Sequence, residues 1–142
     1  MYGKQTINLC NVTSNRIDND MAGYCMDSAY SDSIIEFSTI RSNNQSKSNS
    51  WAINLHSTNN DQISVLSCNY IDNRDLSDYG KLIYSDPGTK LYMFGCCIVG
   101  NIVKYVIYNR GTSFVVNNSY TDNNLTSGNS VNFKNTISST EL

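Results

Sequence analysis

The sequence predicts an all-β fold, a right-handed parallel β-helix (solenoid) of about five coils with uncapped ends. Three observations lead to this prediction. Charged residues make up 15% of the 142 residues and Pro occurs once, whereas Tyr occurs ten times, a composition that suits strands better than a helical bundle. A nine-residue pattern recurs along the chain. A second short strand is expected after each copy, so every repeat has the content of one coil.

The repeated pattern places an apolar residue first, a Cys or small polar residue fourth, a second apolar residue sixth and an Asn last. Successive copies lie 22 to 30 residues apart, which is a suitable length for one coil. A single coil has a face to bury and nothing to bury it against, so coils must stack about 4.8 Å apart with parallel strand pairing. The copies are residues 7–15, 35–43, 65–73, 93–101 and 115–123, with a weaker sixth copy at 131–137.

The closing Asn is present in all five copies. Asn can adopt the left-handed conformation that a tight turn requires, and stacked side-chain amides can donate to one coil and accept from the next. We therefore expect a structural asparagine ladder in which each hydrogen bond contributes roughly 0.5–1.5 kcal/mol. Its predicted members are Asn15, Asn43, Asn73, Asn101 and Asn123.

A second column of small side chains precedes the central apolar residue of each copy. Such side chains fit a tight turn or a crowded interior. We expect the thiols in this column to be free and buried, although the stacked pair Cys68 and Cys96 leaves a disulfide or a metal role open. The predicted members are Cys10, Ser38, Cys68, Cys96 and Asn118.

Further strands are expected after the closing Asn of the first four copies, at residues 23–26, 51–55, 81–84 and 104–108. The apolar stretch 91–108 could alternatively be read as a membrane span. Asn101 and Lys104 lie within it, and a Lys near the centre of a bilayer costs about 2.5–3.5 kcal/mol. We therefore do not expect this segment to cross a membrane, and a small protein anchored through 91–108 is the remotest alternative.

Length and charge limit the organisation and the partners. Residues 1–142 are expected to form a single β-helix domain, a fragment of a longer solenoid, with residues 124–142 as a weak last coil or a frayed tail. The net charge of −2 gives no basic surface, so we expect no binding to nucleic acid. Residues 1–10 contain no apolar run, and no signal peptide is visible there.

The five copies and the weaker sixth make the sequence resemble the right-handed parallel β-helix proteins. This class includes pectate-lyase-like enzymes, polymorphic outer-membrane-type proteins and Asn/Ser-rich surface proteins of protists. The resemblance implies the architecture but does not select an activity, because the fold carries lyases, hydrolases and adhesins alike. In composition the chain is most similar to the non-catalytic surface proteins, which implies an extracellular or cell-surface location.

Carboxylates in the loops are the candidates for surface chemistry. Asp72 and Asp122 share the column before the closing Asn, two coils and therefore about 9.6 Å apart, at the far limit for an inverting glycosidase. The loop that contains Asp72, Asp75 and Asp78 offers oxygen ligands for Ca²⁺ but lacks the Gly and closing Glu of an EF-hand. We interpret these as polar turn residues and predict no metal site and no cofactor. The surface candidates are Asp72, Arg74, Asp75 and Asp78.

Catalysis has little support in the sequence. His56 is the single His, so a catalytic triad has one candidate member, and no Cys has a His placed by the sequence to lower its pKa. We therefore expect a non-catalytic surface or adhesion module that binds a glycan or a protein on a lateral face. Uncapped end coils would also allow end-to-end self-association. The alternative is a divergent polysaccharide lyase or hydrolase of the pectate-lyase-like fold.

Overall fold

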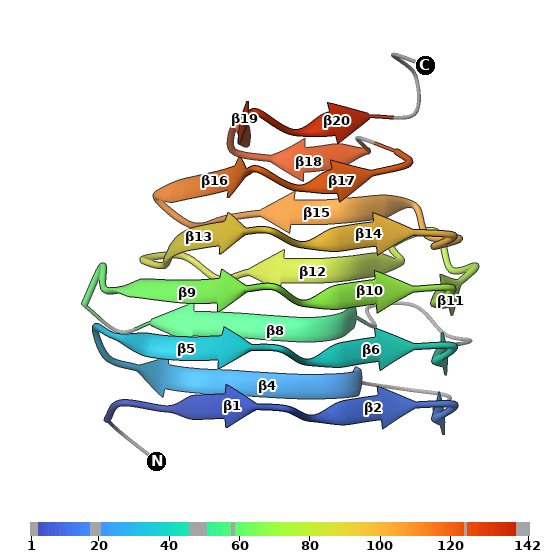
Figure 1. Cartoon of the computed structure of the whole chain (residues 1–142), viewed down its shortest axis with the longest axis horizontal. Helices are drawn as coiled ribbons and strands as arrows, with labels where there is room; N and C mark the ends of the chain where they lie inside the picture. The colour runs from blue at the N-terminus through green and yellow to red at the C-terminus, as the bar shows by residue number, and fades with distance from the viewer. Residues whose placement is uncertain (1–2, 18–20, 46–50, 58, 124, 139–142) are drawn as a thin grey trace.

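A computed structural model describes residues 3–17, 21–45, 51–57, 59–123 and 125–138. The regular elements of these residues are all β-strands, and every pair of neighbouring strands is parallel. The strands stack turn upon turn as a β-solenoid, with β1 at one end of the stack and β20 at the other (Figure 1). The predicted all-β, parallel solenoid fold is thus confirmed.

Four parallel sheets run along the stack, and we number them in the order in which the chain first meets them. Sheet 1 consists of β1 (Thr6–Asn8), β5 (Ser33–Glu36), β9 (Gln62–Leu66), β13 (Lys90–Phe94), β16 (Ser113–Asn117) and β19 (Asn132–Lys134). Sheet 2 consists of β2 (Asn11–Thr13), β6 (Thr39–Arg41), β10 (Asn69–Ile71), β14 (Cys97–Val99), β17 (Tyr120–Thr121) and β20 (Ile137–Ser138). Sheet 3 consists of β3 (Arg16–Ile17), β7 (Asn44–Gln45) and β11 (Arg74–Asp75). Sheet 4 consists of β4 (Met21–Ala29), β8 (Trp51–Ser57), β12 (Lys81–Ser85), β15 (Tyr105–Asn109) and β18 (Thr126–Gly128).

The number of complete turns differs from the predicted five. Three turns contribute a strand to all four sheets, and the later turns add strands to sheets 1, 2 and 4 without a strand in sheet 3 among the described residues. The reason is the shorter connection after Asn101, which reaches β15 at Tyr105, whereas the connection after Asn73 reaches β12 at Lys81. In the fourth turn Ile102 forms an isolated bridge with Arg74 in place of a strand.

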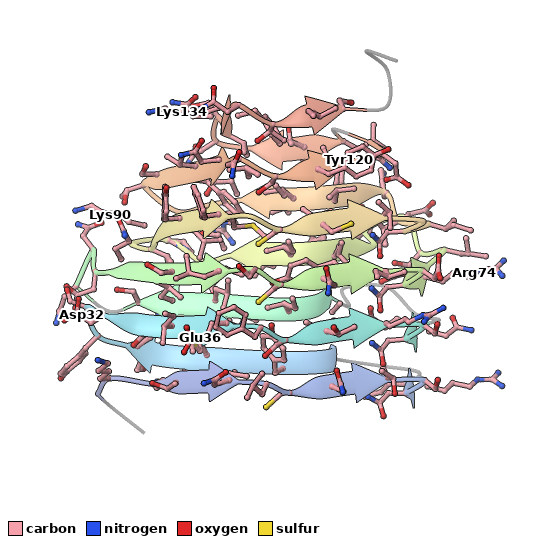
Figure 2. All side chains as sticks on the ribbon, viewed as in Figure 1. Asp32, Glu36, Arg74, Lys90, Tyr120 and Lys134 are labelled. Atoms are coloured by element: carbon pink, nitrogen blue, oxygen red, sulfur yellow. The ribbon has the colours of Figure 1, made fainter. Side chains whose placement is uncertain are left out.

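The core follows from the alternation of side chains along short strands. In sheet 1 one column of equivalent residues points inward, and Ile35, Val65, Met93 and Val116 within it are fully buried. Burying a side chain of this size contributes about 1.5–3 kcal/mol, so each turn is held by its neighbours. Several charged side chains lie at the periphery, where Figure 2 shows Arg74 at one corner and Asp32 and Lys90 at the opposite one. Asp75 and Lys81 are buried.

The strands predicted after the closing Asn residues are present as β4, β8, β12 and β15. The apolar stretch 91–108 folds into parts of β13, β14 and β15. Several of its apolar residues line the interior of the solenoid, where Leu91, Met93 and Ile98 are buried, whereas Phe94 and Ile102 are exposed. Among the described residues, no helix is long and apolar enough to cross a membrane.

The fifth copy of the repeat begins one residue later than predicted. Val116 pairs with Met93, and Thr121 pairs with Ile98, so the copy is 116–124 and not 115–123. Its position equivalent to Asn101 is residue 124, which lies outside the described residues. The closing Asn did not distinguish the two alignments, because residues 123 and 124 are both Asn.

The left-handed residues of the turns are not the predicted Asn residues. At the corner between sheets 2 and 3, the residue before the Asn has positive φ in the first four turns. Such a conformation costs roughly 1–2 kcal/mol in a residue other than Gly, and it frees the following Asn side chain to point along the stack. The left-handed residues at this corner are Ser14, Ser42, Asp72 and Gly100, and those between sheets 1 and 2 are Leu9, Phe37, Ser67, Gly95, Asn118 and Asn135.

Candidate functional site

The structure brings four of the predicted Asn residues into one hydrogen-bonded column. The backbone N–H groups of Asn15, Asn43 and Asn73 each donate to the side-chain oxygen of the Asn in the next turn, at 3.0, 3.2 and 3.0 Å. The side-chain amide of Asn43 donates to Asn73 Oδ1 at 3.0 Å and to the carbonyl of Val12, one turn back, at 2.9 Å. These contacts occupy the amide group fully and leave it no surface chemistry.

Asn123 lies outside this column. Its Oδ1 accepts from the N–H of Leu125 at 2.9 Å, and its own N–H donates to Thr121 Oγ1 at 3.3 Å. The side-chain amide of Asn101 donates to the carbonyl of Tyr70, one turn back, at 2.8 Å, as Asn43 and Asn73 do to Val12 and Ile40. Its second bond, at 3.0 Å, is to the carbonyl of Val99 in place of a further Asn side chain. This difference follows from the shifted register of the fifth turn.

The column of small residues has a local bonding role. In each turn the hydroxyl or thiol donates to the carbonyl oxygen two residues earlier, as Cys68 does to Leu66 at 3.3 Å and Ser38 to Glu36 at 2.9 Å. The fifth member is Ser119 rather than Asn118, because the N–H of Cys96 donates to Ser119 Oγ at 3.0 Å. The column is Cys10, Ser38, Cys68, Cys96, Ser119 and Thr136.

The cysteines are free thiols, and Cys68 and Cys96 are buried in the solenoid interior. Cys10 of the same column is exposed, contrary to the expectation that these thiols are buried. Burial raises the pKa of Cys96 to about 12 and also raises the pKa of Cys68. Both thiols are therefore protonated at neutral pH and poorly nucleophilic. The hydroxyls of Tyr24 and Tyr70 are buried beside them, and burial raises both phenol pKa values, yet neither hydroxyl makes a hydrogen bond of good geometry.

The predicted pair Asp72 and Asp122 does not form a shared site. Register places Asp122 one residue before the position equivalent to Asp72, because Thr121 pairs with Ile98. Asp72 lies 3.8 Å from the guanidinium of Arg41, and both side chains are more than half exposed. Asp122 accepts from the N–H of Gly100 at 2.6 Å. The two carboxylates thus contact different partners and do not form a pair that could act as general acid and general base on one substrate.

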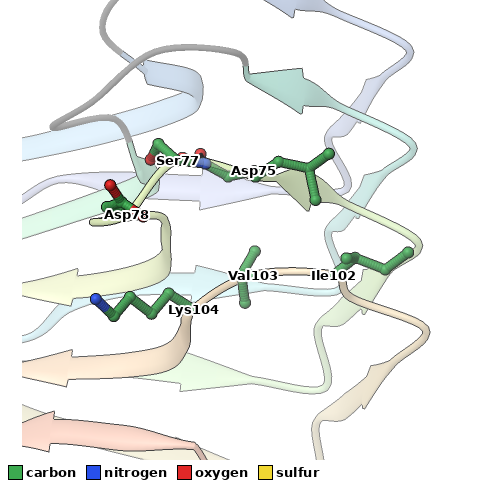
Figure 3. A pocket seen from close by; sticks show the side chains of 7 residues that line it. Asp75, Ser77, Asp78, Ile102, Val103 and Lys104 are labelled. Carbon is green, nitrogen blue, oxygen red and sulfur yellow. Dashed lines mark hydrogen bonds between the residues drawn. The ribbon is translucent and has the colours of Figure 1, made fainter.

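Asp75 and Asp78 line a surface pocket of about 300 Å³ between the loop after β11 and the connection into β15 (Figure 3). Asp75 is buried and accepts from the N–H of Ser77 at 2.9 Å, whereas Asp78 is exposed. Gly80 is required beside them, since a Cβ there would lie 2.7 Å from the Asp75 carboxyl carbon. Arg74 is not part of the lining. The lining residues are Asp75, Leu76, Ser77, Asp78, Ile102, Val103 and Lys104.

A cluster of tyrosines and cations lies next to this pocket on β12 and β15, and we call it the tyrosine face. The rings of Tyr84 and Tyr108 stack with centroids 5.7 Å apart, and Tyr105 meets Tyr108 edge-on at 5.7 Å. Lys81 Nζ lies 5.7 and 5.1 Å from the first two rings, and Arg110 donates to the Tyr84 hydroxyl at 3.3 Å. The tyrosine face consists of Tyr84, Tyr105, Tyr108, Lys81, Lys104 and Arg110.

Sequence reasoning missed the tyrosine face, although the repeat contained a signal. Tyr84 and Tyr108 are paired in register, at equivalent positions of consecutive turns, and Asn54 occupies this position one turn earlier. Two stacked positions of one type indicate side chains in contact across neighbouring turns, here the half-buried Tyr108 on the buried Tyr84. Lys104 extends the face toward the pocket, since its Nζ lies 5.6 Å from the ring of Tyr105 and 5.5 Å from that of Tyr79.

His56 has an acidic partner that the sequence analysis did not identify. Its Nδ1 lies 2.7 Å from Asp27 Oδ1, and this hydrogen bond lowers the pKa of Asp27. The two residues follow Leu55 and Met26, which pair in register across β8 and β4, so they are neighbours in the same sheet as the tyrosine face. Across the described residues, no group of three His, Cys, Asp or Glu side chains could hold a metal ion.

Comparison with protein-family models, with curated proteins and with solved structures found no significant match to this chain. The parallel β-solenoid therefore rests on the structure itself, and the comparisons add no function. The features of the structure that bear on function are the tyrosine face, the adjoining pocket and the Asp27–His56 pair.

Proposed function

We propose that this chain is a non-catalytic surface or adhesion-type module that binds a glycan on its tyrosine face. The observation that carries the proposal is the mutual contact of Tyr84, Tyr105 and Tyr108 with cations on two neighbouring strands. A sugar ring presents an apolar C–H face and a rim of hydroxyls. Tyrosine matches both, with a broad ring and a polar hydroxyl, and the cations supply donors beside it.

Preorganisation supports the same proposal. Tyr84 has 8% of its surface exposed and is held between Lys81, Arg110 and the ring of Tyr108. Tyr84 is buried and supports the half-buried ring of Tyr108, so Tyr105 and Tyr108 are the rings that a sugar can contact. Side chains that are already fixed lose little entropy when a ligand binds. The parallel strands beneath the tyrosine face keep neighbouring rings at the spacing of the turns.

A non-catalytic role agrees with the remaining sites. The carboxylates of Asp72 and Asp122 do not converge, and the buried thiols of Cys68 and Cys96 have raised pKa values. We interpret the asparagine ladder and the stacked small-residue column as the features that relate the chain to pectate-lyase-like β-helices. On this proposal it lies with the extracellular or cell-surface, non-enzymatic members of that class.

The test is glycan binding by the Tyr108→Ala variant against a matched control, Tyr92→Ala. Tyr92 is also half-buried, stacks on Phe94 at 6.3 Å and accepts from Asn117, but it lies on β13 in sheet 1. An aromatic anchor contributes on the order of 2 kcal/mol, so Tyr108→Ala should weaken binding more than about tenfold. If both variants bind the glycan with the same affinity as the unaltered protein, the tyrosine face is not the glycan-binding site.

A second function, a polysaccharide lyase or hydrolase, is favoured by one observation. The hydrogen bond between Asp27 and His56 could orient the imidazole as a general base in the sheet that carries the tyrosine face. The test measures turnover of pectin, alginate and glycosaminoglycans with and without Ca²⁺, using His56→Ala and Asp27→Asn as background. Turnover no higher than that of the variants would end this alternative.

A further inference from the structure

The pocket at the edge of the tyrosine face is divided into a polar and an apolar part. Figure 3 shows Asp78 and Lys104 toward one end of the pocket and Ile102 toward the other. Ile102 and Leu76 are 56% and 64% exposed, so they form an open aliphatic wall. Lys104 belongs to both sites, since it lines the pocket and lies 5.6 Å from the ring of Tyr105.

Within the polar part, Asp78 is the carboxylate that a ligand can reach. Asp75 is 1% exposed and already accepts from the N–H of Ser77. Asp78 and Lys104 are both exposed, and they present one acceptor and one charged donor on the same opening. A ligand that complements this arrangement carries a donor and an acceptor side by side, with an apolar group beyond them.

We infer that the pocket binds the acetamido group of an N-acetylhexosamine unit within the glycan. The inference rests on the proposed function and adds the class of sugar to it. The amide N–H would donate to Asp78, the amide carbonyl would accept from Lys104, and the methyl group would cover Ile102 and Leu76. A pocket of about 300 Å³ is at the lower end of ligand sites and suits one sugar unit.

Other sugars complement the pocket less well. A plain hexose has a hydroxyl where the acetamido group would be, and it leaves the aliphatic wall of Leu76 and Ile102 exposed to water. A uronic acid brings a carboxylate that Lys104 attracts, but it has no N–H for Asp78 and no methyl group to cover the aliphatic wall. The donor and acceptor of the acetamido group match Asp78 and Lys104 in the polar part of the pocket, and its methyl group matches the apolar part.

The experiment compares two tetramers by isothermal titration calorimetry on the whole chain. One is the β-1,4-linked N-acetylglucosamine tetramer and the other is the β-1,4-linked glucose tetramer, which has a hydroxyl in place of each acetamido group. We expect the N-acetylated tetramer to bind at least about tenfold more tightly, the range that filling or emptying a small apolar pocket produces. Asp78→Ala should weaken binding of the N-acetylated tetramer.

A matched pair of variants assigns the preference to the pocket. Ile102→Ser should abolish most of the preference for the N-acetylated tetramer. Ile137→Ser changes another Ile that is also 56% exposed, and it should keep the preference. Leu76→Ser provides a second variant, in a loop, should Ile102→Ser fail to fold by circular dichroism. A preference that survives both Ile102→Ser and Leu76→Ser would overturn the pocket assignment.

Failure of this inference can be distinguished from failure of the proposed function. Equal binding of the two tetramers, or binding of neither, overturns the assignment of an acetamido sugar. In both cases the tyrosine face stands as long as some glycan binds in a manner that Tyr108→Ala weakens and Tyr92→Ala does not. Loss of that dependence would overturn the proposed function itself.

Discussion

Asn73 uses both ends of its side-chain amide at the buried corner between sheets 2 and 3. Its oxygen accepts from the backbone and the side chain of Asn43, and its nitrogen donates to Asn101 Oδ1 and to the carbonyl of Ile40, both at 2.9 Å. The residue is 1% exposed, so water cannot replace these partners. The amide therefore couples three consecutive turns.

Replacing Asn73 should lower the free energy of unfolding more than replacing an Asn outside the column. Asn73→Ala leaves buried donors of Asn43 without an acceptor, and each unsatisfied buried group costs about 1–3 kcal/mol. We expect a loss of at least about 2 kcal/mol in the free energy of unfolding, measured by urea denaturation. Asn69→Ala is the control, since Asn69 is half-buried and its side chain makes one long contact of 3.4 Å to Thr39. Equal losses in the two variants would contradict a special role of the column.

The buried thiol of Cys96 gives the fold a dependence on alkaline pH. Burial raises its pKa from 9.0 to about 12 in the folded protein, so folding keeps the thiol protonated. Its contribution to stability is fully present below about pH 9 and is lost as the pH rises toward about 12. Cys96→Ser removes this titration while matching Ser119 in the same column. The free energy of unfolding should then fall less steeply between pH 9 and pH 11, and equal slopes would contradict this explanation.

At the scale of the element, each turn depends on left-handed corners between its short strands. Gly95 and Gly100 both have positive φ, at 64° and 66°, in the fourth turn. They differ in the space around them, because a Cβ at Gly95 would lie 3.6 Å from Ser67 Oγ, whereas one at Gly100 would lie 2.1 Å from Asp72 Oδ1. A substitution at Gly95 therefore reports the free-energy cost of the left-handed conformation alone. A substitution at Gly100 adds the cost of a steric contact with the neighbouring turn.

This difference predicts the outcome of a pair of substitutions. Gly95→Asn should change the free energy of unfolding by less than about 1 kcal/mol, because Asn tolerates this conformation and Asn118 already adopts it in the next turn. Gly100→Ala should cost more, since the side chain of Asp72 must move away and its contact with Arg41 is disturbed. Thermal unfolding of the two variants measures the order, and the reverse order would contradict it.

At the scale of the whole molecule, the repeat explains which features the sequence could predict. The same local pattern occurs in every turn of the stack. The fold class, the strands of sheet 4 and the positions of Asn43 and Asn73 therefore follow from a single alignment of the repeats. The register of the fifth turn did not follow, because residues 123 and 124 are both Asn and the pairing of Thr121 with Ile98 is needed to distinguish the two alignments.

The surface sites were harder to predict, because they depend on contacts between turns. Asp27 and His56 are 29 residues apart in sequence, and Tyr84 meets Tyr108 across two strands. Contacts between residues of adjacent turns can be predicted only if the register between the turns is known to within one residue. The pocket adds a second requirement, the close approach of Gly80 to Asp75, which no repeated pattern records.

Binding of a glycan to the tyrosine face and its pocket can be tested by mapping the backbone amide chemical shifts by NMR. The titrant is the β-1,4-linked N-acetylglucosamine tetramer, added to the whole chain. We expect the largest shift changes on Tyr84, Tyr105, Tyr108 and residues 75–79, and small changes at Tyr92. Largest changes on sheet 1 would contradict the tyrosine face as the binding site, whereas no changes with this tetramer would contradict the assignment of the pocket to an acetamido sugar.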